Sequence, residues 1–209
     1  MGCRCLALFV CLAGVCLGQE YELGGAIGYG FYRDGTIYSP AGSVEAGIRN
    51  RFAASWVFGE DLYRHVSGEV RYLYHDGHPF LFSGGVKSDI QGQSHAFDYA
   101  LLFHAAKRER RLRPFFTLGA GAKGYVIAGP APAQALPGVA ALTTTDEWKF
   151  LVVVGAGVKY RLRNHVLVRF DLLDYMTGFP RRQIAPAEGN TARGIFQQIT
   201  PLFGASYWF

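Results

Sequence analysis

Eight stretches of the chain alternate apolar and polar residues with a period of two. The last of them ends at Phe209, and Ile199, Phe203, Ala205 and Tyr207 precede it on the same face. A period of two is the repeat of a β-strand whose two faces meet different surroundings. Each stretch is about 9–11 residues or longer, which is enough to cross a bilayer at a tilt. The pattern predicts an all-β chain that forms an eight-stranded antiparallel up-and-down transmembrane β-barrel.

The strands show which surroundings each face prefers. The first is expected at Tyr21–Tyr32 and the second at Val44–Phe58, where Asn50 is the one exception on the apolar face. The others centre on 66–74, 97–105, 116–123, 148–161 and 166–172, and the eighth ends the chain. One face is apolar with aromatic residues towards its ends, and the other is small or charged. A soluble ligand-binding barrel would be apolar inside and polar outside, so this direction of alternation favours a membrane barrel.

The connections between the strands alternate in length. Long segments are expected at 33–43, 75–93, 127–147 and 176–194. Short turns are expected near Gly59–Asp61, Lys107–Arg113 and Arg163–Asn164. With both termini in the periplasm, the short turns lie on the periplasmic side and the long loops outside the cell. The third long loop contains Pro130, Pro132 and Pro137, so we expect it to be poor in strands and mobile.

Residues 1–18 are predicted to be a signal peptide and residues 19–209 the barrel domain. Arg4 precedes an apolar core, and Cys16 and Gly18 supply the small residues of a cleavage site before Gln19. Lipoprotein processing at Cys16 is the alternative, although Val15 is larger than the residue usually found there. The leader contains all four cysteines, so we expect no disulfide or thiol chemistry in the mature chain. Export to the outer membrane of a Gram-negative-type bacterium follows from this leader and the strands.

Charge and hydropathy argue against two classes of protein, namely nucleic-acid-binding proteins and proteins with transmembrane helices. The formal net charge is +5, and the basic residues are too scattered to favour nucleic acid. Beyond the leader, no apolar run reaches the roughly 18 residues of a transmembrane helix.

The inward faces of the strands carry the first candidate site. The predicted lumen charges are Glu22, Glu45, Arg49, Arg51, Glu69, Arg71, Asp98, Lys123, Lys149, Lys159, Arg161, Arg169 and Asp171. Charges in a narrow lumen are costly unless they are paired or hydrated. An eight-stranded barrel leaves little more than side-chain room, which favours a salt-bridge network that fills it. The alternative is a gated narrow pore whose basic excess favours anions.

Two further patterns could be taken for cofactor sites, and neither has the context that such a site needs. Gly119–Gly124 matches the dinucleotide fingerprint in letters, but that motif must end a strand and begin a helix, and here it lies inside a strand. His75 and His78 lie in a long loop without a cysteine or a tight carboxylate cluster, so we expect no metal. No cofactor is expected.

Ser94, His95 and Asp98 are the nearest local set for a lipid-modifying enzyme. The expected alternation turns His95 towards lipid and Asp98 inward, which separates them, so no enzyme is expected. The basic turn 107–113 is the densest charge run. Its simplest interpretation is a solvated periplasmic turn. Contact with anionic lipid headgroups or a periplasmic polymer is the alternative.

Several motifs resemble a known family. They are Gly119–Gly124, Val154–Tyr160, Arg169–Tyr175 and the ending Ser206–Phe209. Together with the order of the strands, they resemble the OmpA-like outer-membrane β-barrel domain over essentially the whole mature chain. Many members carry a second, peptidoglycan-binding domain. This sequence has no residues for it after Phe209, so we do not expect that tethering role.

The resemblance also implies partners. The outer-membrane assembly machinery would recognise the last strand, with Phe203, Tyr207 and Phe209 as the assembly signal, and the barrel would contact outer-membrane lipid. The expected function is a structural or surface role without catalysis, with a narrow passive pore left open. The alternatives are surface binding or adhesion through loops 75–93 and 127–147, and a lipid-modifying enzyme.

Overall fold

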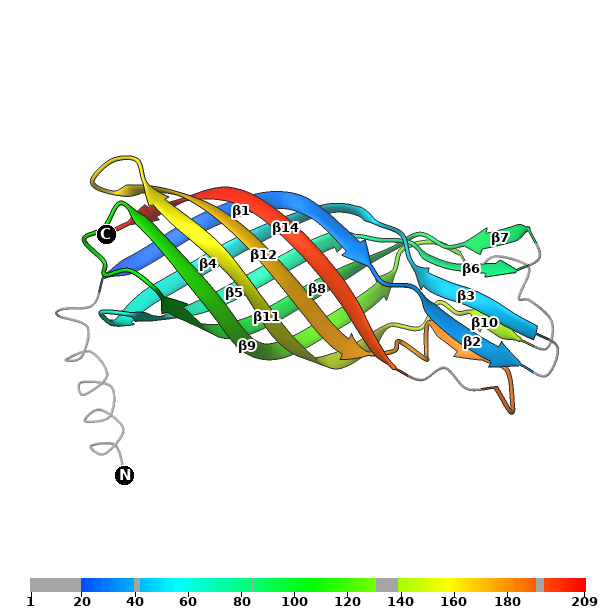
Figure 1. Cartoon of the computed structure of the whole chain (residues 1–209). Coiled ribbons are helices and arrows are strands. Elements are labelled where there is room, and N and C mark those ends of the chain that lie inside the picture. The colour runs from blue at the N-terminus through cyan, green and yellow to red at the C-terminus, as the bar shows by residue number, and fades with distance from the viewer. Residues whose placement is uncertain (1–19, 40–41, 84, 131–138, 191–193) are drawn as a thin grey trace, which may run out of the picture.

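The computed structural model describes residues 20–39, 42–83, 85–130, 139–190 and 194–209. The predicted signal peptide therefore lies outside the described residues. Eight long strands form one closed barrel, and six short strands extend beyond one end of it (Figure 1). The described residues contain no helix long and apolar enough to cross a membrane.

The barrel is built from strands that pair antiparallel with their neighbours in the chain. They are β1 (Tyr21–Tyr32), β4 (Arg51–Tyr63), β5 (Val66–Asp76), β8 (Gly92–His104), β9 (Leu112–Ile127), β11 (Glu147–Arg161), β12 (Val166–Gly178) and β14 (Ile195–Trp208). The last strand, β14, pairs with both β12 and β1, which closes the sheet. Closure leaves the barrel without a free sheet edge. The predicted eight-stranded antiparallel up-and-down barrel is confirmed.

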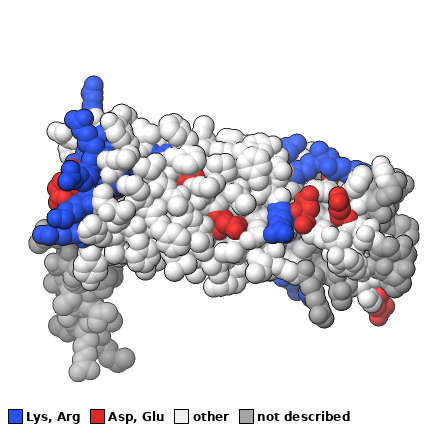
Figure 2. Space-filling view, viewed as in Figure 1, with Lys and Arg blue, Asp and Glu red and all other residues white. Residues whose placement is uncertain are grey.

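Burial alternates along the barrel strands as the period of two predicts. On β4, Trp56 is 65% exposed on the outer face, whereas its neighbours Ser55 and Val57 are buried. The other barrel strands also place aromatic and aliphatic residues outside. In Figure 2 the Lys and Arg residues gather mainly at the two ends of the molecule, and the surface between these ends consists mostly of uncharged residues. An exposed apolar surface of this extent suits lipid and not water.

The six short strands form a structure that we call the head. Strands β2 (Gly35–Ser39), β3 (Gly42–Ile48), β6 (Pro79–Ser83) and β7 (Val86–Asp89) form a four-stranded sheet in the order β2-β3-β6-β7. Strands β10 (Ala140–Leu142) and β13 (Ile184–Pro186) pair with each other. The segments predicted to be long loops therefore contain strands. Of the loop predicted to be mobile, residues 131–138 lie outside the described residues.

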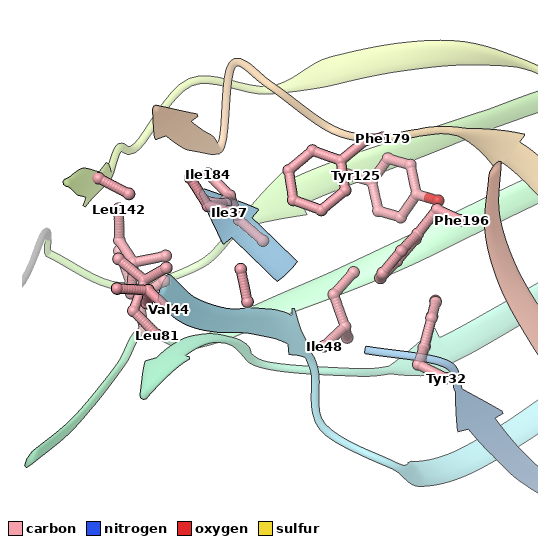
Figure 3. Close-up of a cluster of buried hydrophobic side chains, with 13 residues drawn as sticks. Tyr32, Ile37, Val44, Ile48, Leu81, Tyr125, Leu142, Phe179, Ile184 and Phe196 are labelled. Atoms are coloured by element: carbon pink, nitrogen blue, oxygen red, sulfur yellow. The ribbon is translucent and has the colours of Figure 1, made fainter. Parts of the chain in front are cut away.

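An apolar core joins the head to the barrel (Figure 3). It contains Ile37 and Val44 of the four-stranded sheet, Ile184 of β13, and Tyr125 and Phe196 from the barrel strands β9 and β14. All five side chains are buried. The head thus packs on the barrel mouth through side chains of both parts.

The prediction of one strand over Val44–Phe58 is wrong. The structure divides this stretch into β3 in the head and β4 in the barrel, with a break at Arg49 and Asn50. Asn50 Oδ1 accepts the backbone N–H of Tyr32 at 2.7 Å, so its side chain binds the rim of the barrel. The apolar residues of β3 are buried in the head core. A period of two shows that one face is apolar, but not whether lipid or protein covers it.

The end of the barrel opposite the head carries the start of β1, the C-terminus and the short turns, and we call it the short-turn end (Figure 1). Two of the three predicted turns lie where expected. The turn predicted near Lys107–Arg113 joins β8, which ends at His104, to β9, which begins at Leu112. The turn predicted near Arg163–Asn164 lies in residues 162–165, between β11 and β12. The turn predicted at Gly59–Asp61 is wrong, since β4 continues to Tyr63 and the chain turns at residues 64–65.

Candidate functional site

The structure places the predicted lumen charges in three locations. Glu22, Glu69, Arg71, Asp98, Lys123, Lys159, Arg169 and Asp171 are buried inside the barrel. Arg51, Lys149 and Arg161 are partly buried at its two mouths. Glu45 and Arg49 are not in the lumen. Glu45 is exposed on β3 of the head and Arg49 follows that strand, where it pairs with Asp89 at 2.5 Å, because β3 does not continue into the barrel.

Arg169 lies at the centre of a buried ion network. Its Nε donates to Asp171 Oδ2 at 2.8 Å, and its Nη1 donates to Glu69 Oε2 at 2.8 Å. Its Nη2 donates to Glu69 Oε1 at 3.1 Å, so that carboxylate is bound by both arms of the guanidinium. Lys159 Nζ donates to Glu22 Oε2 at 2.5 Å, and Glu22 Oε1 lies 3.4 Å from Arg169. Such multiple pairing is what makes buried charges tolerable.

The ion network has fewer hydrogen bonds around Arg71 and Asp98. Arg71 donates to the Glu69 carboxylate through Nη2. Its Nε and Nη1, and both carboxylate oxygens of Asp98, have no hydrogen-bond partner among the described residues. Arg71 and Asp98 are directly opposite each other on β5 and β8. Asp98 therefore meets the network through charge and not through a hydrogen bond.

An apolar layer crosses the lumen between the ion network and the head. Its members are Ala26, Ala53, Leu73, Ala96, Leu151, Val153, Leu173, Tyr175 and Leu202. On β5 and β12 the layer begins two residues beyond the ion network, at Leu73 and Leu173. The sequence analysis did not identify this layer. The sequence does contain a signal for this layer. At 151–154 four apolar residues follow one another, so the residues on the lumen face are apolar as well as those on the lipid face.

A second polar group lies between the apolar layer and the head. Lys123 Nζ donates to the Tyr32 hydroxyl at 2.9 Å and to Gln198 Oε1, and it lies over the Tyr32 and Tyr125 rings at 4.7 and 5.2 Å. The described residues supply no ion pair to it. The Tyr125 hydroxyl and Thr177 Oγ1 are 2.8 Å apart. Neutral oxygens and aromatic faces therefore stabilise the buried ammonium.

The candidate metal ligands do not converge. His75 is buried inside the barrel, and neither of its ring nitrogens has a hydrogen-bond partner among the described residues. His78 lies in the head, where its Nε2 is 3.7 Å from Asp76 Oδ1. Within the described part of the chain, no group of three His, Cys, Asp or Glu residues could hold a metal ion.

The candidate catalytic set is divided by the barrel wall. Ser94 and Asp98 point inward, where Ser94 Oγ lies 3.2 Å from the Tyr32 hydroxyl. His95 lies on the outer face, and its Nδ1 is 2.8 Å from the Tyr72 hydroxyl. These three residues therefore form no Ser–His–acid arrangement. The motif 119–124 lies within β9, as its position in a strand predicted.

The short-turn end contains a small cleft with about 20 Å³ of room, which we call the mouth cleft. Asp61 Oδ2 lies 3.0 Å from Arg108 Nε and 3.5 Å from Arg113 Nη1. The guanidinium groups of Arg108 and Arg161 lie 5.0 and 5.1 Å from the Trp208 ring. Four arginines of the basic turn that was predicted to be solvated therefore line this cleft: Arg108, Arg110, Arg111 and Arg113.

The predicted assembly-signal residues Phe203, Tyr207 and Phe209 have exposed side chains on the outer face. The backbone N–H of Phe209 donates to the Tyr21 carbonyl at 2.9 Å, and the Tyr21 N–H donates to the Phe209 carbonyl at 2.8 Å. The last residue thus joins the first strand of the barrel. Recognition by an assembly machinery stays a prediction.

Comparison with known proteins bears on the fold. No protein-family model and no curated protein sequence matches the chain. The crystal structure of Neisserial surface protein A (NspA) matches with a TM-score of 0.54 at 10% identity, over 91% of this chain and 98% of NspA. A major outer membrane protein from Thermus thermophilus matches with a TM-score of 0.57 at 12% identity, over 92% and 100% of the two chains. The chain therefore has the fold of an outer-membrane β-barrel, and the resemblance inferred from its motifs is confirmed at the level of fold.

Proposed function

We propose that the protein is an integral β-barrel of the bacterial outer membrane, and that its filled barrel anchors an ordered head at the cell surface. The exposed apolar belt supports the membrane location. In barrels of this kind the end with the short turns faces the periplasm, and the longer connections face the exterior. In this orientation the head is extracellular.

The apolar layer is the observation that carries this proposal. A conducting lumen needs a continuous hydrated path. Leu73, Leu151, Leu173 and Leu202 are at most 1% exposed and come from four different strands around the barrel. The ion network fills the lumen on one side of the layer, and the head core covers the other side. The barrel is therefore an anchor and not a pore.

Planar-bilayer recording of refolded residues 19–209 tests this assignment. A heat-dependent shift in gel mobility first shows that the barrel is folded, and a general porin in the same bilayer shows that the recording detects channels. We expect no discrete conductance steps from the inserted barrel. Salt-dependent steps with anion preference would contradict the proposal and would make the lumen charges a conducting path.

The head is the part that this function places in contact with the environment. Its core makes it a folded unit, so loss of a core side chain should open the head while the barrel stays intact. Ile37→Ala removes a fully buried side chain of β2, and Thr36→Ala changes an exposed neighbour on the same strand. We expect Ile37→Ala alone to increase trypsin cleavage at Lys87, with the heat-dependent gel shift retained. Equal cleavage of both variants would contradict an ordered head.

A second candidate is adhesion through the head, and the outward face of its four-stranded sheet favours it. Tyr38 is 68% exposed there, and Phe82 lies beside Glu45 and Lys87 in adjacent strands. Exposed aromatic side chains are enriched on recognition surfaces. Bacteria that display the Tyr38→Ser and Phe82→Ser double variant should adhere less to extracellular matrix than bacteria that display the unchanged protein. Equal adhesion at equal surface display would exclude this face.

A further inference from the structure

Strand β2 forms one edge of the four-stranded sheet of the head, and its outer side has no neighbouring strand. It pairs only with β3, and no described residue outside β3 gives residues 35–39 a backbone hydrogen bond. The barrel strand on this side is β14, which begins at Ile195 after Gly194, whose φ of 131° departs from extended backbone. The Arg33 N–H still donates to the Gln197 carbonyl at 3.0 Å. Beyond this bond, β2 continues into the head without a partner on this side in the described chain (Figure 1).

The register of the β2–β3 pair shows which backbone groups of β2 are free. Gly35 lies opposite Ala46, and a Cβ at Gly35 would lie 3.6 Å from the Ala46 carbonyl oxygen, so this oxygen points towards β2. In an antiparallel pair, residues that exchange backbone bonds alternate with residues that direct these groups to the other side. Thr36 and Tyr38 are therefore the residues whose N–H and carbonyl groups face the free edge.

The two edges of this sheet differ in how they are protected. Strand β7, at the other edge, carries Lys87 and Asp89, and Asp89 pairs with Arg49. Charged side chains on an edge strand discourage the addition of another strand. Strand β2 has the sequence Gly-Thr-Ile-Tyr-Ser, with no charged residue and no proline. Its edge, roughly 17 Å long for a strand of this length, is thus open to pairing.

A groove of about 630 Å³ runs along the free edge, between β2 and the beginning of β14. Tyr38 of β2 and Ile195 of β14 line it with exposed side chains. Phe179 lines it from the core side, since a Cβ at Gly35 would lie 3.0 Å from the Phe179 ring. An extended segment in this groove would meet the free backbone groups of β2 on one side and apolar side chains around it.

The charged residues of the groove, Arg33 and Asp34, lie next to each other just before β2. Asp34 is turned towards β3, because a Cβ at Gly47 would clash with its Oδ1. Arg33 is exposed and forms no ion pair with a described residue, and its Nη1 lies 3.5 Å from Gln197 Oε1. The charge left for a ligand is therefore positive, which favours a segment with an acidic side chain at this end.

We propose that the free edge of β2 binds an extended segment of another protein outside the cell, which adds to the head sheet as a further strand. The segment exchanges backbone hydrogen bonds with Thr36 and Tyr38, as in other cases where a peptide extends a sheet. Its apolar side chains pack on Tyr38, Ile195 and Phe179, and an acidic residue lies near Arg33. This inference deepens the proposed adhesion by the head, and it rests on a head that is ordered and displayed outside the cell.

Fluorescence anisotropy of a labelled peptide, measured with the refolded barrel in lipid nanodiscs, tests the proposal. The probe is a synthetic copy of residues 42–48, Gly-Ser-Val-Glu-Ala-Gly-Ile. As β3, this sequence pairs antiparallel with β2, and it alternates apolar residues with small or polar ones and has one acidic side chain. We expect saturable binding to the wild type. The same peptide with N-methyl groups along its backbone should not bind, because it has no N–H groups to donate to β2.

Thr36→Pro removes the N–H that faces the groove and leaves the backbone bonds to β3 in place. It should weaken peptide binding about tenfold, because one backbone hydrogen bond is lost and the ring obstructs the edge. The matched control is Thr36→Ala, which changes the same side chain, keeps the N–H and should bind the peptide as the wild type does. Arg33→Gln should weaken binding about threefold, as the loss of one exposed ion pair predicts. It should not affect a peptide whose Glu is replaced by Gln.

Trypsin cleavage at Lys87 is measured on every variant and separates the two levels of the argument. Rapid cleavage of the folded wild-type barrel at Lys87 would contradict the ordered head, and with it the proposed function. With an ordered head, no binding of the peptide, equal binding of the N-methylated peptide, or equal binding by wild type and Thr36→Pro would overturn the site at the free edge. Unchanged affinity in Arg33→Gln would overturn the acidic residue of the segment.

The oligomeric state of the same samples tests the other occupant of the edge. A barrel that is a dimer as wild type and a monomer as Thr36→Pro would assign the edge to a second copy of the chain, which would also overturn the proposal. If Thr36→Pro opens the head, the comparison of the two peptides on the wild type still decides the question.

Discussion

Removal of the central arginine from the ion network should destabilise the barrel strongly. Arg169→Met replaces a fully buried guanidinium that binds Asp171 and Glu69 through four hydrogen bonds of 2.8 to 3.2 Å and approaches Glu22. The substitution keeps most of the side-chain volume and removes the charge. The carboxylates then stay buried with fewer partners, which costs about 3–5 kcal/mol for a buried pair that loses one member.

The free energy of unfolding in urea, measured in lipid vesicles, gives this cost. The control is Arg49→Met, because the Arg49–Asp89 pair is more than one-third exposed on both sides and such pairs contribute about 0–1 kcal/mol. A second variant, Arg169→Met with Asp171→Leu, should recover part of the loss, since it also removes a buried carboxylate that Arg169 had bound. A loss below about 1 kcal/mol for Arg169→Met would refute the interpretation that these contacts offset the burial of charge.

Three further predictions concern the head, the barrel wall and assembly. Burial and the Arg51 guanidinium lower the pKa of His78 in the folded protein. The contribution of neutral His78 to the stability of the head is therefore present above the pKa of the unfolded state and is lost as the pH falls through the pKa of the folded state. Arg51→Gln should raise the pKa of His78 in an NMR titration, and an unchanged pKa would contradict this. A Cβ at Gly121 would lie 1.9 Å from a backbone oxygen of β8, so Gly121→Ala should lower the urea midpoint of unfolding, whereas Gly178→Ala, with open space around it, should not. Phe209→Ala should reduce the amount of protein assembled in the outer membrane of living cells while refolding in detergent stays unchanged, and equal loss in both assays would assign Phe209 a role in stability alone.

The period of two was sufficient to predict the barrel strands. In 21–32 it located β1 to the residue, and in the stretch before Phe209 it identified the closing strand. It could do so because a membrane barrel exposes each strand to lipid on one side and to a narrow lumen on the other, so every strand carries the same local signal. The inward direction of residues such as Arg169 follows from the same local rule.

The tertiary structure decided what covers each face and which charges meet. Val44 and Ile48 alternate as lipid-facing residues do, but the head core covers them, and Glu45 lies outside the lumen for the same reason. Glu22 and Lys159 are 137 residues apart in the chain, and only closure of the barrel brings them together. Alternation is a property of neighbouring residues, whereas the occupant of a face and the partner of a buried charge depend on segments that are distant in sequence.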